Sequence, residues 1–158
     1  MSEHAEMTYD SFCETAAPVR DALLALGKAV NAAGIDKTLI ELMKVRVSQL
    51  NGCAFCINMH IGLARKLGVS QQMLDLLPAW RETDLYSPRE RVILGWAEAL
   101  TDLTSHRDVA AARAALFAEF SVREAAYITA AIANISAWNR IGAGLGFPPV
   151  IEATRPAA

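Results

Sequence analysis

The sequence predicts an all-α protein with a single domain. Apolar residues recur at spacings of three and four along most of the chain, alanine is abundant, and runs of β-branched residues are short. A chain of 158 residues is normally one domain and can bury one sizeable core. We expect the helical domain to span residues 18–147, with an N-terminal extension at 1–17 and a C-terminal tail at 148–158.

Cap and stop residues mark where the helices begin and end. Asp and Ser side chains can cap a helix N-terminus, as we expect for Asp36, whereas Gly and Pro commonly end a helix. Two capping boxes, Ser87-Pro88-Arg89-Glu90 and Ser121-Val122-Arg123-Glu124, place a glutamate three residues after a serine. The expected helices run over residues 18–33, 37–50, 54–67, a short stretch between Ser70 and Pro78, 88–103, 108–120 and 121–142, with Gly34, Gly52 and Gly68 as stop signals and an irregular loop at 79–86.

Helical periodicity assigns a packing face to the first three of these helices. One face of the first helix carries Val19, Leu23, Leu26 and Val30, and one stripe of the third carries Ile57, Ile61 and Ala64. In the second helix, the residues expected to face inward are Leu39, Leu42, Met43, Val47 and Leu50. In the second helix, Glu41, Lys44 and Ser48 share a different stripe. The last helix is apolar nearly all round, which suits either a subunit contact or a central position in a monomer.

Composition limits the function classes and the setting. The 15 basic and 17 acidic residues, with a pI near 5.9, give no electrostatic reason to expect binding to nucleic acid or to an anionic membrane. The apolar stretch at 125–138 is shorter than the roughly 20 residues of a membrane span, and residues 1–10 lack the pattern of a secretory signal. We therefore expect a cytoplasmic protein. In a reducing compartment, a close cysteine pair indicates catalysis or metal binding, and we interpret the isolated Cys13 as a buried or incidental thiol.

The most informative motif is Cys53-Ala54-Phe55-Cys56, followed by His60. If Cys53 caps the helix at 54–67, the two cysteine Cβ atoms lie about 5 to 6 Å apart, so a small adjustment permits a disulfide. A thiol with a pKa of about 8.5 is only about 3% ionised at pH 7, and a helix N-terminus contributes only about 0.3 to 1 kcal/mol. His60 lies one turn beyond Cys56 and can accept the thiol proton, so Cys56 is the better candidate nucleophile.

Glu41 joins this group through the geometry of a helical hairpin. It lies 11 positions before Gly52, and His60 lies eight positions after, so the two are about 16 Å and 12 Å from the turn at 1.5 Å per residue. In an antiparallel hairpin their axial offset is about 4 Å. A carboxylate at that position can hold the imidazole directly or through one water, which fixes its tautomer and raises its basicity.

The spacing of these four residues resembles the signature of the alkylhydroperoxidase D-like proteins of the carboxymuconolactone decarboxylase superfamily. The similarity extends to residues 42–52 and 64–68 and, more diffusely, over 18–147, including Asn134 and residues 138–140. It implies an all-helical fold assembled as trimers or hexamers, in which the cysteine pair reduces peroxides through an internal disulfide. By this resemblance Cys56 is the peroxidatic thiol, Cys53 the resolving thiol and His60 the proton acceptor, with Glu41 orienting His60 through water.

One residue inside the motif departs from the family pattern. The best-known members carry a histidine between the cysteines, where this chain has Phe55. A second imidazole is therefore missing from the pair, and Phe55 can instead line a substrate entrance. The lactone decarboxylases of the superfamily lack the cysteine pair, which makes decarboxylation the weaker analogy. The tryptophans Trp80, Trp96 and Trp138 are most simply packing residues.

We interpret the chain as a thiol-dependent alkylhydroperoxidase that uses an external dithiol or thiol-protein reductant and no metal or other cofactor. Two other classes stay open. Cys53, Cys56 and His60 supply three zinc ligand types, as in a redox sensor or zinc-binding protein, although a fourth ligand is missing nearby. Glu41 and His60 can also serve a lyase that acts on a small acid.

Overall fold

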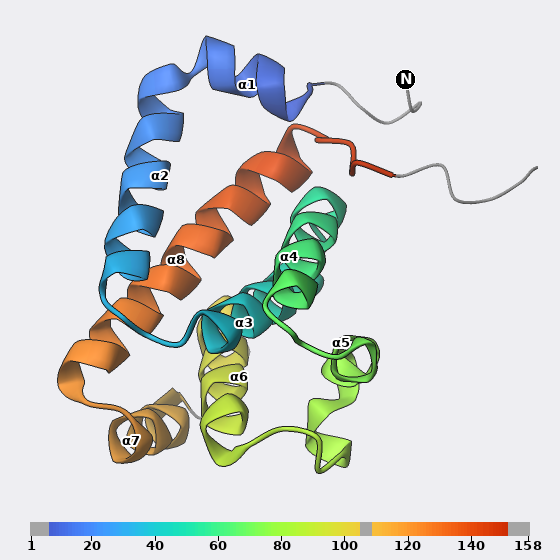
Figure 1. The fold of residues 1–158 in the computed structure, drawn as a ribbon. Coiled ribbons are helices and arrows are strands. Elements are labelled where there is room, and N and C mark those ends of the chain that lie inside the picture. The colour runs from blue at the N-terminus through green and yellow to red at the C-terminus, as the bar shows by residue number, and fades with distance from the viewer. Residues whose placement is uncertain (1–6, 105–108, 152–158) are drawn as a thin grey trace, which may run out of the picture.

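The computed structural model describes residues 7–104 and 109–151, and every regular element in these ranges is helical (Figure 1). The predicted all-α class is confirmed. The elements are α1 (Tyr9–Thr15), α2 (Ala17–Ala32), α3 (Lys37–Leu50), α4 (Ala54–Lys66), α5 (Gln71–Leu76), the 3-10 helix η1 (Leu77–Glu82), α6 (Pro88–Thr101), α7 (Val109–Glu119) and α8 (Val122–Gly144). The helix start expected at residue 108, and the outer parts of 1–17 and 148–158, lie outside the described residues.

The predicted caps are confirmed because their side chains accept hydrogen bonds from the first turns. Asp36 accepts from the backbone N–H of Thr38 at 2.8 Å, and both serine capping boxes are formed in full. The predicted stop signals are also confirmed: Gly34, Gly52 and Gly68 take positive φ values of 80°, 68° and 94°. Such values suit glycine because it has no Cβ to clash with the backbone.

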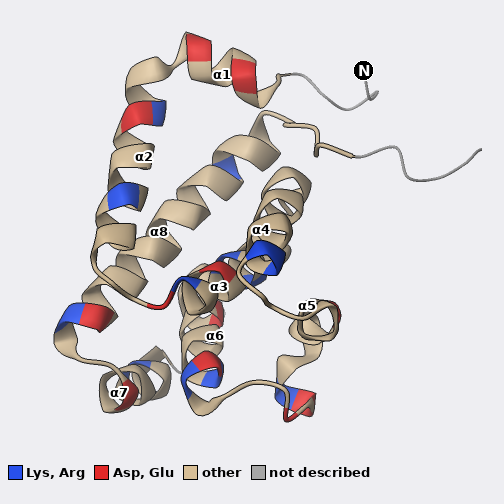
Figure 2. Cartoon of the chain, in the orientation of Figure 1, with Lys and Arg blue, Asp and Glu red and all other residues tan. Residues whose placement is uncertain are grey.

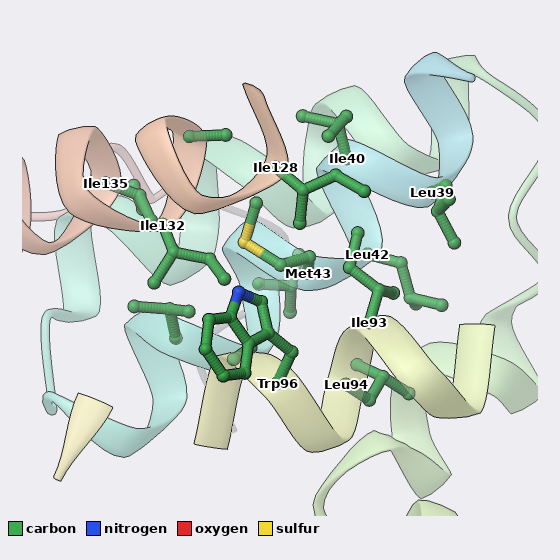
Figure 3. Close-up of a cluster of buried hydrophobic side chains, with 14 of the residues drawn as sticks. Leu39, Ile40, Leu42, Met43, Ile93, Leu94, Trp96, Ile128, Ile132 and Ile135 are labelled. Atoms are coloured by element: carbon green, nitrogen blue, oxygen red, sulfur yellow. The ribbon is translucent and has the colours of Figure 1, made fainter. Parts of the chain in front are cut away.

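Helix α3 lies at the centre of the bundle, where it contacts α4, α6 and α8. Figure 3 shows its apolar side chains between those of α6 and α8. Because α3 has neighbours on several sides, Glu41 and Ser48 are buried together with the apolar residues rather than forming an outer stripe. The prediction that Leu50 faces inward is wrong: it lies in the last turn of α3 and is 38% exposed.

Helix α2 runs along one side of α8 (Figure 1). The predicted packing face of α2 is wrong in part, since Val19 and Leu26 are 50% and 37% exposed and Val30 is its only buried residue. Helix α2 meets α8 along a narrow stripe that includes Gly27. Helix α1 lies within the stretch expected to be an extension, and its buried Phe12 packs against the ring of Trp138.

The segment expected to be an irregular loop at 79–86 is helical in its first part. Helix η1 runs through it with a kink at Ala79, where φ is −114° and ψ is 29°. Trp80 in this segment donates a hydrogen bond to the buried carboxylate of Glu98 on α6, which holds the segment against α6. The same carboxylate also accepts from Arg46 on α3 and Arg81 on η1. Helix α6 ends at Thr101, two residues before the predicted end.

Charged residues are interspersed in sign over the molecule in the view of Figure 2, and α8 is mostly uncharged. None of the described helices combines the length and the apolar character needed to cross a membrane.

The C-terminal part of α8 is hydrogen-bonded to the end of α3 and to the turn that follows it. Asn139, which is fully buried, donates to Ser48 Oγ at 3.0 Å and accepts from the side-chain amide of Asn51 at 3.0 Å. One turn later, Gly142 faces the start of α4: a Cβ on it would lie 3.1 Å from Cys53 Sγ and 3.6 Å from Cys56 Sγ. Because glycine has no Cβ, the two sulfur atoms can pack this close to the α8 backbone.

Substitution of Gly142 by alanine tests this contact. We expect Gly142→Ala to lower the free energy of unfolding by about 1–3 kcal/mol, because the added methyl overpacks against Cys53 Sγ. The control is Gly144→Ala on the same helix, where a Cβ would meet nothing within 4 Å. That variant should be neutral or more stable by up to about 1 kcal/mol in urea unfolding. Equal effects of the two variants would contradict the close contact.

Candidate active site

The two motif cysteines lie at the start of α4 and are joined as a disulfide, with their Cα atoms 5.3 Å apart. Cys53 is the N-cap residue, as expected, and its sulfur accepts from the backbone N–H of Cys56 at 3.3 Å. Both residues are buried, at 1% and 2% exposure. The geometry therefore permits the redox pair that the spacing suggested.

His60 and Glu41 are in direct contact. His60 Nδ1 lies 2.6 Å from Glu41 Oε2, across the hairpin between α4 and α3. This distance leaves no room for a bridging water, so the water-mediated contact implied by the family resemblance is corrected to a direct one. An ionised carboxylate can only accept, so Nδ1 carries the proton and Nε2 of the neutral ring is left as an acceptor.

Lys44 completes this group and was missed as a site residue. Its Nζ donates to Glu41 Oε1 at 2.7 Å, one helical turn along α3. The sequence spacing already placed Glu41 and Lys44 on one stripe of the helix. An exposed pair at this spacing would contribute little to stability, but these two side chains are only 11% and 17% exposed. Each carboxylate oxygen of Glu41 thus has one partner.

The charge state of Glu41 follows from these contacts. Burial on its own would raise the pKa of this carboxyl, but the hydrogen bond to His60 and the nearby charge of Lys44 outweigh burial. The pKa of Glu41 is therefore held below its ordinary value of 4.5, and the side chain is ionised at neutral pH.

A cavity of about 270 Å³ opens beside this group. Cys56 and His60 both border it, together with Lys44, whereas Cys53 is not among its lining residues. Phe55 also lines the cavity. Its ring stacks on Tyr9 of α1, with centroids 5.4 Å apart.

The remaining candidate residues lie apart from this arrangement. Cys13 on α1 is a free, half-buried thiol and does not line the cavity. Trp80 and Trp96 are buried packing residues, as expected, but Trp138 borders the cavity. Within residues 7–104 and 109–151, no three side chains of the His, Cys, Asp or Glu type group in a way that could hold a metal ion.

The pH dependence of stability tests the ion-paired state of Glu41. A carboxyl whose pKa is lowered by folding stabilises the protein above its unfolded pKa, and this contribution is lost as the pH falls through the folded pKa. We expect the stability difference between the wild type and Glu41→Gln to shrink progressively below about pH 4.5, the ordinary value for this group.

Urea unfolding between pH 2.5 and 7 measures this difference. Glu82→Gln, at an exposed glutamate, provides the control for removing one carboxylate from the surface. A difference that stays constant or grows as the pH falls below about 4.5 would contradict the assigned charge state.

Comparison with known proteins agrees with the fold. The model of the carboxymuconolactone decarboxylase family matches residues 17–99. The uncharacterised protein YdfG of Bacillus subtilis is 35% identical over 136 residues, which cover 86% of this chain and 92% of YdfG.

Solved structures share the architecture. A protein of unknown function from Agrobacterium tumefaciens, described as a putative antioxidant defence protein AhpD, is 35% identical with a TM-score of 0.85, covering 94% of this chain and 99% of its own. The debrominase Bmp8 has a TM-score of 0.77 at 23% identity, with 89% of this chain and 74% of Bmp8 covered, and this likeness shows the fold alone. From the matched family model and the extent of these similarities, the chain belongs to the carboxymuconolactone decarboxylase family and is AhpD-like in its fold.

Proposed function

We propose that this protein is a thiol-dependent peroxidase that reduces organic hydroperoxides through the Cys53–Cys56 disulfide. The observation that carries the proposal is the shared cavity: Cys56 borders it together with His60, and His60 is held by an ionised carboxylate. A nucleophile and a base border one cavity, and an orienting group holds the base from behind, as covalent catalysis requires.

The first step is attack of the Cys56 thiolate on the outer oxygen of the peroxide. The S–O bond forms as the O–O bond breaks, which leaves a sulfenic acid on Cys56 and releases an alcohol. His60 accepts the thiol proton at Nε2 and returns it to the departing alkoxide. Glu41 contacts Nδ1 throughout and favours the imidazolium that forms between the two transfers.

The second step closes the disulfide. The Cys53 thiolate attacks the sulfur of the Cys56 sulfenic acid, and the hydroxide leaves with a proton as water. An external dithiol or thiol protein then reduces the disulfide by exchange and is itself oxidised, so each cycle consumes one peroxide and two thiols. The placement of Cys56 on the cavity and of Cys53 outside its lining supports this order of roles.

The setting that we propose is a homo-oligomer in the cytoplasm, a trimer or hexamer by the family resemblance. Apolar side chains stay exposed on α2 and α4, which supports self-association through these helices. Their exposures are 37–44%, and they are Leu24 and Leu26 on α2, Met59 and Leu63 on α4, and Leu67 at the C-cap of α4.

Cysteine variants test the redox roles. In Cys56→Ser, peroxide-dependent oxidation of a dithiol should fall to the uncatalysed rate. In Cys53→Ser, dimedone should trap a sulfenic acid at Cys56 without disulfide formation, as read by mass spectrometry. The control is Cys13→Ser, which should retain activity because Cys13 lies outside the cavity lining.

Two outcomes would contradict the proposal. Full turnover in Cys56→Ser would show that Cys56 takes no part in the reaction. A sulfenic acid trapped only at Cys53 would show that the two cysteines have the opposite roles. A separate activity on small acids that survives loss of both cysteines would point to the lyase alternative.

The proton relay is tested at His60. Because general acid–base groups contribute about 10²–10⁴-fold, we expect His60→Asn to lower kcat/KM for cumene hydroperoxide by about 10²-fold or more. Glu41→Gln should give a smaller loss and shift the pH–rate profile, because it acts through His60. Stopped-flow measurement of sulfenic acid formation separates this step from reduction of the disulfide. An unchanged rate in His60→Asn would exclude the relay.

A further inference from the structure

The cavity beside Cys56 is larger than a peroxide group requires. Its volume is about 270 Å³, whereas a dry cavity of about 150 Å³ already holds benzene. Hydrogen peroxide would leave most of this space unfilled. The cavity therefore suits a peroxide that carries an organic body.

The walls of the cavity near Cys56 are apolar. The rings of Phe55 and Tyr9 stack with centroids 5.4 Å apart, and the centroid of Trp138 lies 6.1 Å from that of Tyr9. Ile135, one turn before Trp138 on α8, continues the apolar lining away from the sulfur atoms. Flat apolar groups pack well against such side chains. This part of the cavity suits the organic body of a ligand.

The wall formed by α2 carries a positive charge without a partner. Lys28 lines the cavity and is exposed. It is the only charged residue between Asp21 and Asp36, so α2 offers it no acidic neighbour one turn away (Figure 2). Within the part of the chain that the structure describes, its ammonium group makes no ion pair and no hydrogen bond.

The other charges at the cavity balance one another. Lys44 lines it as well, but its Nζ is paired with Glu41 Oε1 at 2.7 Å. The lining contains no Asp or Glu among the described residues. With the imidazole of His60 in its neutral form, the lining carries one unbalanced positive charge, on Lys28. A charge of this kind attracts an anionic group of a ligand.

Asn31 provides a second donor beside Lys28. It lies three positions later on α2, also lines the cavity and is exposed. Residues three apart on a helix have Cβ atoms about 5–6 Å apart, so the ammonium and the side-chain amide can both donate to one group. A carboxylate matches the pair because it brings one negative charge and two acceptor oxygens.

We propose that the substrate is an organic hydroperoxide that carries a carboxylate, which Lys28 and Asn31 hold while the peroxide reaches Cys56. This inference rests on the proposed peroxidase function and adds the substrate class. The apolar walls between the two ends hold the body of the molecule, and the carboxylate fixes which way round it enters.

The span between the two ends fits a small molecule. Gly27, next to Lys28, faces Asn134 on α8, because a Cβ on Gly27 would lie 3.3 Å from Asn134 Nδ2. Gly142, eight residues later on α8, adjoins Cys56 Sγ, and eight residues are about 12 Å along a helix. The four-carbon stem of Lys28 covers part of this span. A single benzene ring with para substituents bridges the rest.

Stable alcohol analogues measure the recognition without the peroxide chemistry. The probes are the para-carboxylate and the para-carboxamide of 2-phenyl-2-propanol, which match in shape and differ in charge. By isothermal titration calorimetry at low salt, the wild-type protein should bind the carboxylate about two- to fivefold more tightly, as expected for an exposed ion pair. Lys28→Gln should abolish this preference, Lys28→Arg should retain it, and high salt should weaken it.

The matched control is Lys66→Gln, the same exchange at an exposed lysine of α4 that does not line this cavity. This variant should keep the preference for the carboxylate. Asn31→Ala should weaken binding of the carboxylate, because one of the two donors is lost. Equal affinities of the wild type for the two probes would overturn the inference. A preference that persists in Lys28→Gln, or that Lys66→Gln removes to the same extent, would overturn it as well.

The corresponding hydroperoxides separate this inference from the proposed function. The ratio of kcat/KM values for the para-carboxylate and the para-carboxamide of cumene hydroperoxide should be about two to five in the wild type and about one in Lys28→Gln. If neither hydroperoxide is turned over but the binding preference holds, the peroxidase proposal fails and the carboxylate site stands. Turnover of both with no preference in rate or binding overturns the carboxylate site alone.

Discussion

Helix α3 constrains the whole structure because it is buried along most of its length while carrying polar side chains. An unpaired buried charge costs several kcal/mol, so each such group must meet a partner from a neighbouring element. The pairs that result are Glu41 with His60 of α4, Arg46 with Glu98 of α6, and Ser48 with Asn139 of α8. These contacts fix the three helices that surround α3, and the apolar core fills the space between them (Figure 3).

The need of buried charges on α3 for a partner also determines where the candidate catalytic residues lie. The partner that Glu41 needs is an imidazole one turn from Cys56, so satisfying a buried carboxylate also orients the candidate base. Lys44 offsets the remaining negative charge and borders the cavity as well. Stability and function are therefore linked at this pair, because a change that relaxes the ion pair also frees the imidazole.

Local signals explain why most of the fold could be predicted from the sequence. Caps such as Asp36 and the two serine boxes act within one helical turn, and the motif from Glu41 to His60 needs only a hairpin to bring its ends together. The packing face of α2 was mispredicted because Val19 and Leu26 fit the helical period but stay 50% and 37% exposed. Helix α1 depends on contacts between distant segments, such as that of Phe12 with Trp138, which periodicity does not report.

The depth of the two sulfur atoms has a consequence for how the oxidised protein is reset. With Cys53 and Cys56 exposed by only 1% and 2%, a folded reductant cannot bring its own thiolate into line with the S–S bond across the intact surface. In the proposed cycle, the reductant is therefore either a dithiol small enough to enter beside Phe55, or a folded protein that reaches the disulfide after a swing of α1 carries Tyr9 off that ring. For a folded reductant, the first helix then governs how quickly the oxidised form is reduced.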